Sequence, residues 1–204
     1  MIRRMTIFLL MAGFVVYPLL AQNVKMNVRG HIGYSYLWEK NIDAGLESGF
    51  GFSVPFTKRI AFAFDVGYWK NEVHQRENQL LDGSLTITPF YFSIHYHLWP
   101  QARFVPYVFA GGGLVFTSFK KEDIIGIPEI TIRQEVDDGL GWQTGGGALL
   151  KINQRLALYG EFEYLHKQGK GTTTITDMNF GTRKEHFSVS LNSFLLRIGL
   201  KYFF

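Results

Sequence analysis

The alternation of large apolar residues with small, polar or charged ones at every second position limits this chain's possible folds more than any other feature. Successive side chains of a β-strand point to opposite faces, whereas a helix repeats every 3.6 residues. In residues 60–68, one face carries Ile60, Phe62, Phe64, Val66 and Tyr68, and the other carries Ala61, Ala63, Asp65 and Gly67. Eight stretches of this kind occur, at about 24–36, 46–54, 60–68, 84–98, 104–119, 140–153, 156–164 and 187–204. The sequence therefore predicts an all-β protein with eight strands.

The first 21 residues have the pattern of a secretory signal peptide. Arg3 and Arg4 give a positive start, residues 7–20 form a short apolar segment, and Ala21 is a suitable cleavage residue. An N-terminal membrane anchor is the alternative interpretation. We expect export, cleavage near Ala21 and a mature domain over residues 22–204.

The mature part contains no run of about 20 apolar residues, so the sequence predicts no transmembrane helix there. It is then either soluble or a membrane-spanning barrel, the other form that can cross a bilayer. The connections after the second, fourth and sixth stretches are short, whereas 70–82, 120–139 and 167–186 are longer and polar. Short turns at one end and long loops at the other are typical of an eight-stranded antiparallel up-and-down transmembrane β-barrel.

A soluble lipocalin-like barrel is the main competitor, because it also has eight alternating strands but buries its apolar face inside. Phe, Tyr and Trp make up 16% of the residues, and aromatic side chains favour strands and membrane interfaces. Tyr and Trp also gather near the ends of the apolar faces, as an interfacial girdle requires. These residues are Tyr34, Tyr36, Tyr68, Trp142, Tyr164 and Tyr202. The sequence therefore favours the membrane barrel.

Charge and cysteine content exclude several classes of function. The chain has no cysteine, which excludes disulfides, thiolate metal sites and lipoprotein-type acylation. Removing residues 1–21 takes away two arginines and no acid, so the net charge of +4 falls by two. No basic stripe appears, and we expect no nucleic-acid partner. We expect a monomer without a cofactor.

Three segments carry a resemblance to known proteins. Residues 196–204 resemble the C-terminal signature of bacterial outer-membrane proteins, and residues 106–113 and 141–147 resemble strands of the small OmpW-like and OmpA-like barrels. The resemblance implies a barrel in the bacterial outer membrane, among its lipid and lipopolysaccharide. It also implies that Leu200, Tyr202 and Phe204 form a signal read by the barrel assembly machinery. It implies no particular activity.

A second resemblance is to the lipid A 3-O-deacylases, which are barrels with a His-x-Ser pair late in the chain. His166 matches the general base of that family, but Gln168 stands where the nucleophilic serine would be. An amide cannot serve as that nucleophile. The other His-x-Ser, at His186 and Ser188, lacks the asparagine expected beside it. We therefore assign no catalytic residue.

Charged residues on the small-residue face are the main candidate site. Five of them should lie at similar heights in the lumen, namely Arg29, Glu47, Asp65, Glu161 and Arg197, and Glu163 belongs to the same network. The favoured interpretation is a structural network of ion pairs that fills the barrel, and the alternative is the gate of a narrow pore. Because the first and last strands meet at closure, we expect Arg29 beside Arg197. Because the second and third strands are neighbours, we expect Glu47 near Asp65. Replacing Arg197 by Ala should then leave Glu161 unpaired.

Four smaller features have ordinary structural explanations. His95 and His97 share a face, and His31 points inward, so they could bind a metal, but lumenal hydrogen bonding is favoured and no metal ligand is assigned. The glycine triplets 111–113 and 145–147 should relieve crowding rather than bind phosphate. Pro89 should mark a β-bulge. Residues 172–176 should extend strands beyond the membrane, with a host-binding surface as a further reading.

These observations predict a non-enzymatic role in envelope structure or surface interaction. An OmpW-like conduit for small apolar molecules is the alternative, and a lipid A-modifying hydrolase is the third interpretation. The sequence names neither a ligand nor a transported solute.

Overall fold

The computed structural model describes residues 26–39, 42–74, 83–121, 130–177 and 181–204, all of them strands, turns or short connections. The predicted signal peptide lies outside the described residues. Within the described ranges, no helix is long and apolar enough to cross a membrane.

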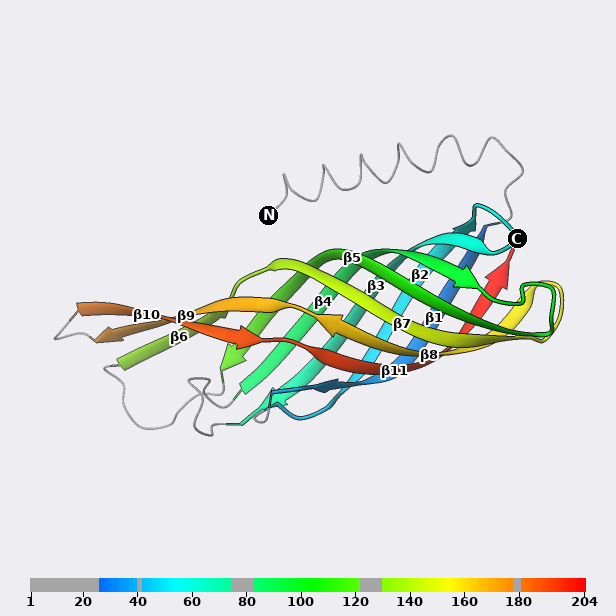
Figure 1. Ribbon diagram of the computed structural model, residues 1–204. Coiled ribbons are helices and arrows are strands. Elements are labelled where there is room, and N and C mark those ends of the chain that lie inside the picture. Colours follow the sequence, from blue (N-terminus) through cyan, green and yellow to red (C-terminus); the bar gives the residue numbers. More distant parts are fainter. Residues whose placement is uncertain (1–25, 40–41, 75–82, 122–129, 178–180) are drawn as a thin grey trace.

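Eight strands close into one antiparallel barrel, which confirms the predicted fold class (Figure 1). Neighbours in sequence are neighbours in the wall, and the first strand pairs with the last to close it, with Asn27 opposite Phe203. The strands in barrel order are β1 (Asn27–Leu37), β11 (Ser193–Phe203), β8 (Leu156–His166), β7 (Gly139–Lys151), β5 (Phe104–Lys121), β4 (Gly83–His97), β3 (Ile60–Val73) and β2 (Gly45–Pro55).

Three further strands form a small sheet that projects beyond the barrel, at the end opposite the C-terminus (Figure 1). They are β6 (Ile130–Val136), β9 (Gln168–Asp177) and β10 (Gly181–Ser190), with β9 in the middle. Residues 172–176 lie in β9 and extend beyond the barrel wall, as predicted. The predicted last strand, 187–204, is wrong at its start, because residues 187–190 belong to β10 and the barrel strand begins at Ser193.

Partway along their length, the strands exchange the polar and apolar character of their two faces. Along β3 the outward residues change from Tyr68 to Lys70 and Glu72, while the inward residues change from Asp65 to the fully buried Trp69. Below this change the outside of the wall is an apolar belt, in which Ile32 is 67% exposed and Leu46 79% exposed. Exposed apolar rows suit lipid, and polar outward residues with an apolar interior suit water. The change therefore divides the barrel into a part whose outer wall suits lipid and a part, nearer the projecting sheet, that is built like a soluble barrel.

The strand β4 passes through Pro89 without a change of phase. Leu85, Ile87, Pro89 and Tyr91 are all buried, so every second residue stays inward on both sides of the proline. The predicted β-bulge is therefore wrong. Proline has no backbone N–H, and the ladder between β3 and β4 lacks the pairs at residues 67–68 and 88–89 while keeping the same register on either side.

Candidate functional site: the lumenal charge network

The six predicted charged residues all lie buried inside the barrel, and we call them the charge network: Arg29, Glu47, Asp65, Glu161, Glu163 and Arg197. They come from β1, β2, β3, β8 and β11, where each occupies an inward position of its strand. The structure brings them together as two groups, each built around one arginine. Each guanidinium meets two carboxylates, which is the kind of pairing that buried charges require.

The group nearer the short turns, at the end of the barrel away from the projecting sheet, is centred on Arg29. Its Nε donates to Oδ1 of Asp65 at 2.7 Å, and Nη2 donates to Oδ2 of the same carboxylate. Its Nη1 donates to Oε1 of Glu161 at 2.8 Å. The Tyr107 hydroxyl donates to the same oxygen of Glu161 at 2.7 Å. Arg29 thus makes a bidentate ion pair with Asp65 and a single hydrogen bond to Glu161.

The second group is centred on Arg197, nearer the outer surface. Its Nε donates to Oε1 of Glu47 at 3.0 Å, and its Nη1 donates to Oε2 of Glu163. The side chains of Glu47 and Glu163 are fully buried. Their charges therefore depend on Arg197 and its neighbours rather than on water.

His31 joins the two groups. Its Nε2 lies 2.9 Å from Oε1 of Glu47, and its Nδ1 lies 3.1 Å from the hydroxyl of Tyr159. The guanidinium carbon of Arg29 lies 5.8 Å from the centre of the Tyr159 ring, within cation–π range. Sequence reasoning placed His31 in the lumen but did not connect it with the charges. Tyr159 was also placed on the inward face, but the contacts of His31 with Tyr159 and Glu47 depend on the stagger between strands, which the sequence pattern does not give.

Two details of the expected arrangement are wrong. The register of β1 with β11 sets Arg29 opposite Lys201, whereas Arg197 lies opposite Gly33, four residues along β1. The register of β2 with β3 likewise sets Asp65 opposite Gly51 rather than Glu47. Arg29 and Arg197 are therefore not directly opposite each other across the strands, and neither are Glu47 and Asp65. Strand order follows from the sequence, but the stagger between neighbouring strands does not.

The same stagger corrects the expected effect of losing Arg197. Glu161 lies across from Arg197 in the β8–β11 ladder, but its Oε1 is bonded to Arg29 and Tyr107. The acid left without its main partner in an Arg197→Ala variant would be Glu163. Glu47 would keep its contact with His31.

Inward glycines leave the space that the long charged side chains occupy. A Cβ on Gly51 would lie 2.1 Å from Oδ1 of Asp65, and one on Gly33 would lie 2.7 Å from Oε2 of Glu47. Real Cβ atoms essentially never make contacts this short, so a larger residue at either position would have to displace the acid side chain. The small residues opposite the charges are thus part of the network's geometry.

Apolar side chains fill the lumen on both sides of the charge network. Towards the short turns lie Val105, Phe109, Leu149 and Ala157. Towards the outside lies a larger group that we call the apolar cap: Leu37, Ile42, Trp69, Val73, Leu85, Ile87, Tyr91, Val115, Val136, Leu165, Val189, Leu191 and Leu195. Val136 and Val189 belong to the projecting sheet, so the sheet packs onto the barrel mouth. The alternating pattern predicted mainly small, polar or charged residues inside the barrel and did not reveal this cap.

The two histidines that share a face of β4, His95 and His97, make separate contacts. His95 is buried, bonds to the Ser93 hydroxyl at 3.0 Å and stacks on Phe109 with ring centres 5.0 Å apart. His97 is the last residue of β4, next to a short turn, and its Nδ1 is 3.3 Å from the carbonyl of Arg59. These contacts are ordinary hydrogen bonds and stacking.

The residues compared with the deacylases do not form a catalytic group in the described part of the chain. The His166 ring stacks on Trp142, with ring centres 5.1 Å apart, on the outward side of the wall. His186 lies on β10, where its Nδ1 is 3.2 Å from the hydroxyl of Thr172. Neither imidazole has a hydrogen bond to a serine or an acid among the described contacts.

The predicted assembly signal lies on the lipid side of the last strand. Leu200, Tyr202 and Phe204 are exposed, while Lys201 between them is buried in the lumen. The rings of Tyr202 and Phe204 meet edge to face at 5.2 Å. Recognition of these residues by the assembly machinery stays a prediction.

Comparison with known proteins shows similarity of structure rather than of sequence. No protein-family profile matches the chain, and no curated protein matches it. The outer membrane protein OprG from Pseudomonas aeruginosa superposes with a TM-score of 0.68 at 17% identity, covering 89% of this chain and 96% of that one. A major outer membrane protein from Thermus thermophilus gives 0.57 at 16% identity, with 90% and 100% covered. Outer Membrane Protein W from E. coli gives 0.55 at 15% identity, with 89% and 98% covered. The chain therefore has the eight-stranded fold of the small outer-membrane β-barrels.

Proposed function

We propose that this protein is a non-enzymatic component of the bacterial outer membrane, with a closed lumen and a projecting sheet that serves envelope structure or surface interaction. The filled lumen is the observation that carries the proposal. The charge network and the two apolar groups around it occupy the barrel from the periplasmic turns to the mouth. An eight-stranded barrel has room inside for side chains and little else.

The charge network supports a closed resting state for an energetic reason. Opening a pore would separate buried pairs such as Arg197 and Glu163, and removing one partner from a buried pair costs about 3–5 kcal/mol. Two arginines each hold two acids, so several contacts would have to break together. We therefore interpret the network as a fixed plug rather than a gate.

The projecting sheet supports the surface part of the proposal. Lys167 fastens it to the barrel, because its Nζ donates to the carbonyl of Asp137 at 2.9 Å and lies 3.3 Å from that of Val115. Thr117 of β5 adds two bonds, from its N–H to Asp138 and from its hydroxyl to the Val136 carbonyl, both at 2.9 Å. A sheet held in this way presents a defined surface outside the membrane, among lipopolysaccharide and possible extracellular partners.

Planar bilayer recording of the folded mature protein tests the closed lumen. Folding is first checked by the shift in electrophoretic mobility between unboiled and boiled samples. We expect this heat-dependent shift together with a silent bilayer. Discrete conductance steps would instead reassign the charge network from plug to gate.

A conduit for small apolar molecules is the second candidate, and two observations favour it. The outer half of the lumen is lined by the apolar cap, and the β3–β4 ladder is interrupted beside Pro89. An apolar solute could enter such a cap and leave sideways into lipid. Uptake of a small alkane or alkanol into liposomes containing the protein, compared with empty liposomes, separates the two candidates. Faster uptake would favour the conduit.

A further inference from the structure

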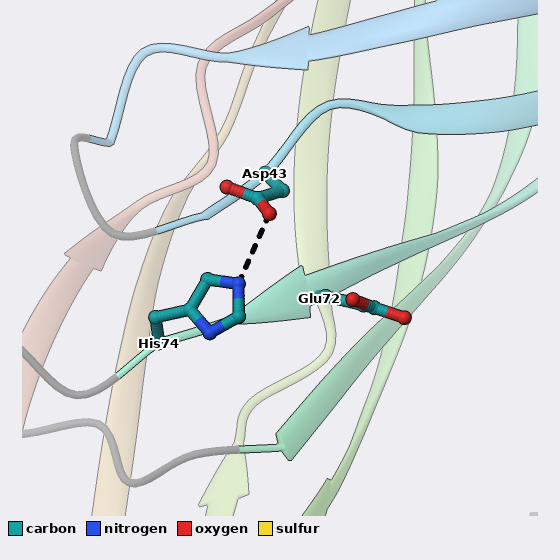
Figure 2. Close-up of side chains that lie close together, drawn as sticks. All are labelled: Asp43, Glu72 and His74. Carbon is teal, nitrogen blue, oxygen red and sulfur yellow. Dashed lines mark hydrogen bonds and ion pairs between the residues drawn. The ribbon is translucent and has the colours of Figure 1, made fainter.

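We propose that Asp43, Glu72 and His74 form a binding site for a divalent transition-metal ion, with Zn²⁺ as the best match, on the outer rim of the barrel. This site lies outside the lumen and is independent of the proposed function. Figure 2 shows the three side chains, with Asp43 from the segment that leads into β2, Glu72 from the end of β3, and His74 directly after β3. Sequence reasoning missed it because residue 43 lies about thirty positions from the other two.

The distances fit shared coordination of one ion. One ligand atom from each residue lies within 4.8 Å of the others. Nε2 of His74 lies 3.0 Å from Oδ2 of Asp43. Two ligands of a tetrahedral zinc ion, with bonds of 2.0–2.2 Å, lie about 3.3 Å apart. The histidine and aspartate are therefore already spaced as two ligands, and a rotation of the Glu72 side chain can bring in the third.

The backbone beneath the site is held in place without a metal. The N–H of Asp43 donates to the carbonyl of Glu72 at 2.8 Å, and Ile42 forms an isolated β-bridge with Val73. The fully buried Asn71 donates from Nδ2 to the carbonyl of Asp43 at 2.8 Å. The two ligand-bearing segments are thus fixed to each other, so binding requires ordering of side chains alone.

The site's position explains its exposure. Glu72 and His74 occupy outward positions beyond the change at Tyr68, so at about 3.3 Å per residue and a strand tilt near 40° they lie roughly 10 Å and roughly 15 Å outside that level. The side chains of His74 and Asp43 are 56% and 63% exposed. An ion from the external medium can therefore reach them directly.

The donor set selects the class of ion. An imidazole nitrogen favours Zn²⁺, Cu²⁺ or Ni²⁺, whereas Mg²⁺ and Ca²⁺ prefer oxygen ligands alone. Two carboxylates and one neutral imidazole would balance the double charge of the ion. Three protein ligands also leave an open position for water or an external anion.

Titration calorimetry of the mature barrel, folded in detergent without a polyhistidine tag and stripped with chelator, tests the proposal. We expect one Zn²⁺ ion per chain, and much weaker binding of Mg²⁺. His74→Ala should lower Zn²⁺ affinity at least roughly tenfold, the loss that even a change next to a zinc ligand produces. Glu72→Gln, which keeps the shape of the side chain, should also weaken binding.

His186→Ala is the matched control, because His186 is also exposed but lies on the projecting sheet. It should bind Zn²⁺ like the wild type, and all variants should keep the heat-dependent mobility shift of a folded barrel. The proposal is overturned if the wild type binds no stoichiometric Zn²⁺, if His74→Ala and Glu72→Gln bind as tightly as the wild type, or if Mg²⁺ binds equally well.

Discussion

Replacing Arg197 by Ala should destabilise the barrel strongly, because this arginine holds two buried acids. Its Nε and Nη1 donate to Glu47 and Glu163, whose side chains are fully buried. Removing one partner of a buried ion pair costs about 3–5 kcal/mol, since the remaining charge loses its partner without regaining water. Glu47 keeps His31, so most of the cost should come from Glu163.

A double variant shows whether the unpaired charge is the cause. Arg197→Met combined with Glu163→Gln removes the charge from both partners while keeping much of their volume. The double variant should lose less free energy of unfolding than Arg197→Met and Glu163→Gln lose together when made singly. The difference should be at least about 1 kcal/mol, within the range for residues in contact. Arg183→Ala is the control, because Arg183 pairs with Glu185 on the exposed face of β10 and should contribute less than about 1 kcal/mol.

Urea unfolding in lipid vesicles, followed by tryptophan fluorescence, measures these free energies. The variants are compared at constant pH and salt, with the folded fraction checked independently by electrophoretic mobility. An Arg197→Ala variant that unfolds like the wild type would refute the network as a source of stability. If the loss in the double variant equals the sum of the two single losses, the destabilisation does not arise from the unpaired charge of Glu163.

Three other changes test separate parts of the structure. Ile32→Arg puts a charge in the lipid-facing belt and should cost about 2–4 kcal/mol if the residue lies near the bilayer midplane, measured by the same unfolding assay; no loss would argue against a lipid contact there. Gly51→Val would place a Cβ 2.1 Å from Oδ1 of Asp65, so it should reduce the yield of folded barrel on gels, and a wild-type yield would show that Asp65 can move freely. Burial at the barrel mouth lowers the pKa of Lys167 from 10.5 to about 8. Between these values the folded state binds fewer protons than the unfolded state, so the free energy of unfolding should rise with pH. Unfolding at pH 7.5 and 10 should show a rise that Lys167→Met reduces, and an equal rise in both proteins would contradict this assignment.

The sequence predicts the wall of the barrel well because each strand carries a local signal. The alternation in residues 60–68 shows which side chains face lipid, and the short turns show which strands are neighbours. Both signals depend on residues close together in the chain. For this reason the strand order and the inward position of Arg29, Glu161 and Arg197 agree with the structure.

The contacts inside the lumen depend on the stagger between strands, which no local pattern encodes. A shift of four residues separates the expected neighbour of Arg29 from the observed one, Lys201. The apolar cap was missed for a different reason. The alternation of β3 continues past Tyr68, but the solvent outside changes from lipid to water, so Trp69 points inward where a membrane pattern predicts a small or charged residue.

Lipid access along one strand tests the central claim most directly. The chain has no cysteine, so single cysteines can be placed at each position of β8 and spin-labelled in the folded, bilayer-embedded protein. We expect oxygen accessibility to peak at the outward Leu158 and Phe162 and to fall at the inward Tyr159 and Glu161, with a period of two. The opposite phase, with Leu158 and Phe162 shielded and Tyr159 and Glu161 exposed to water, would contradict the membrane barrel and support a soluble one.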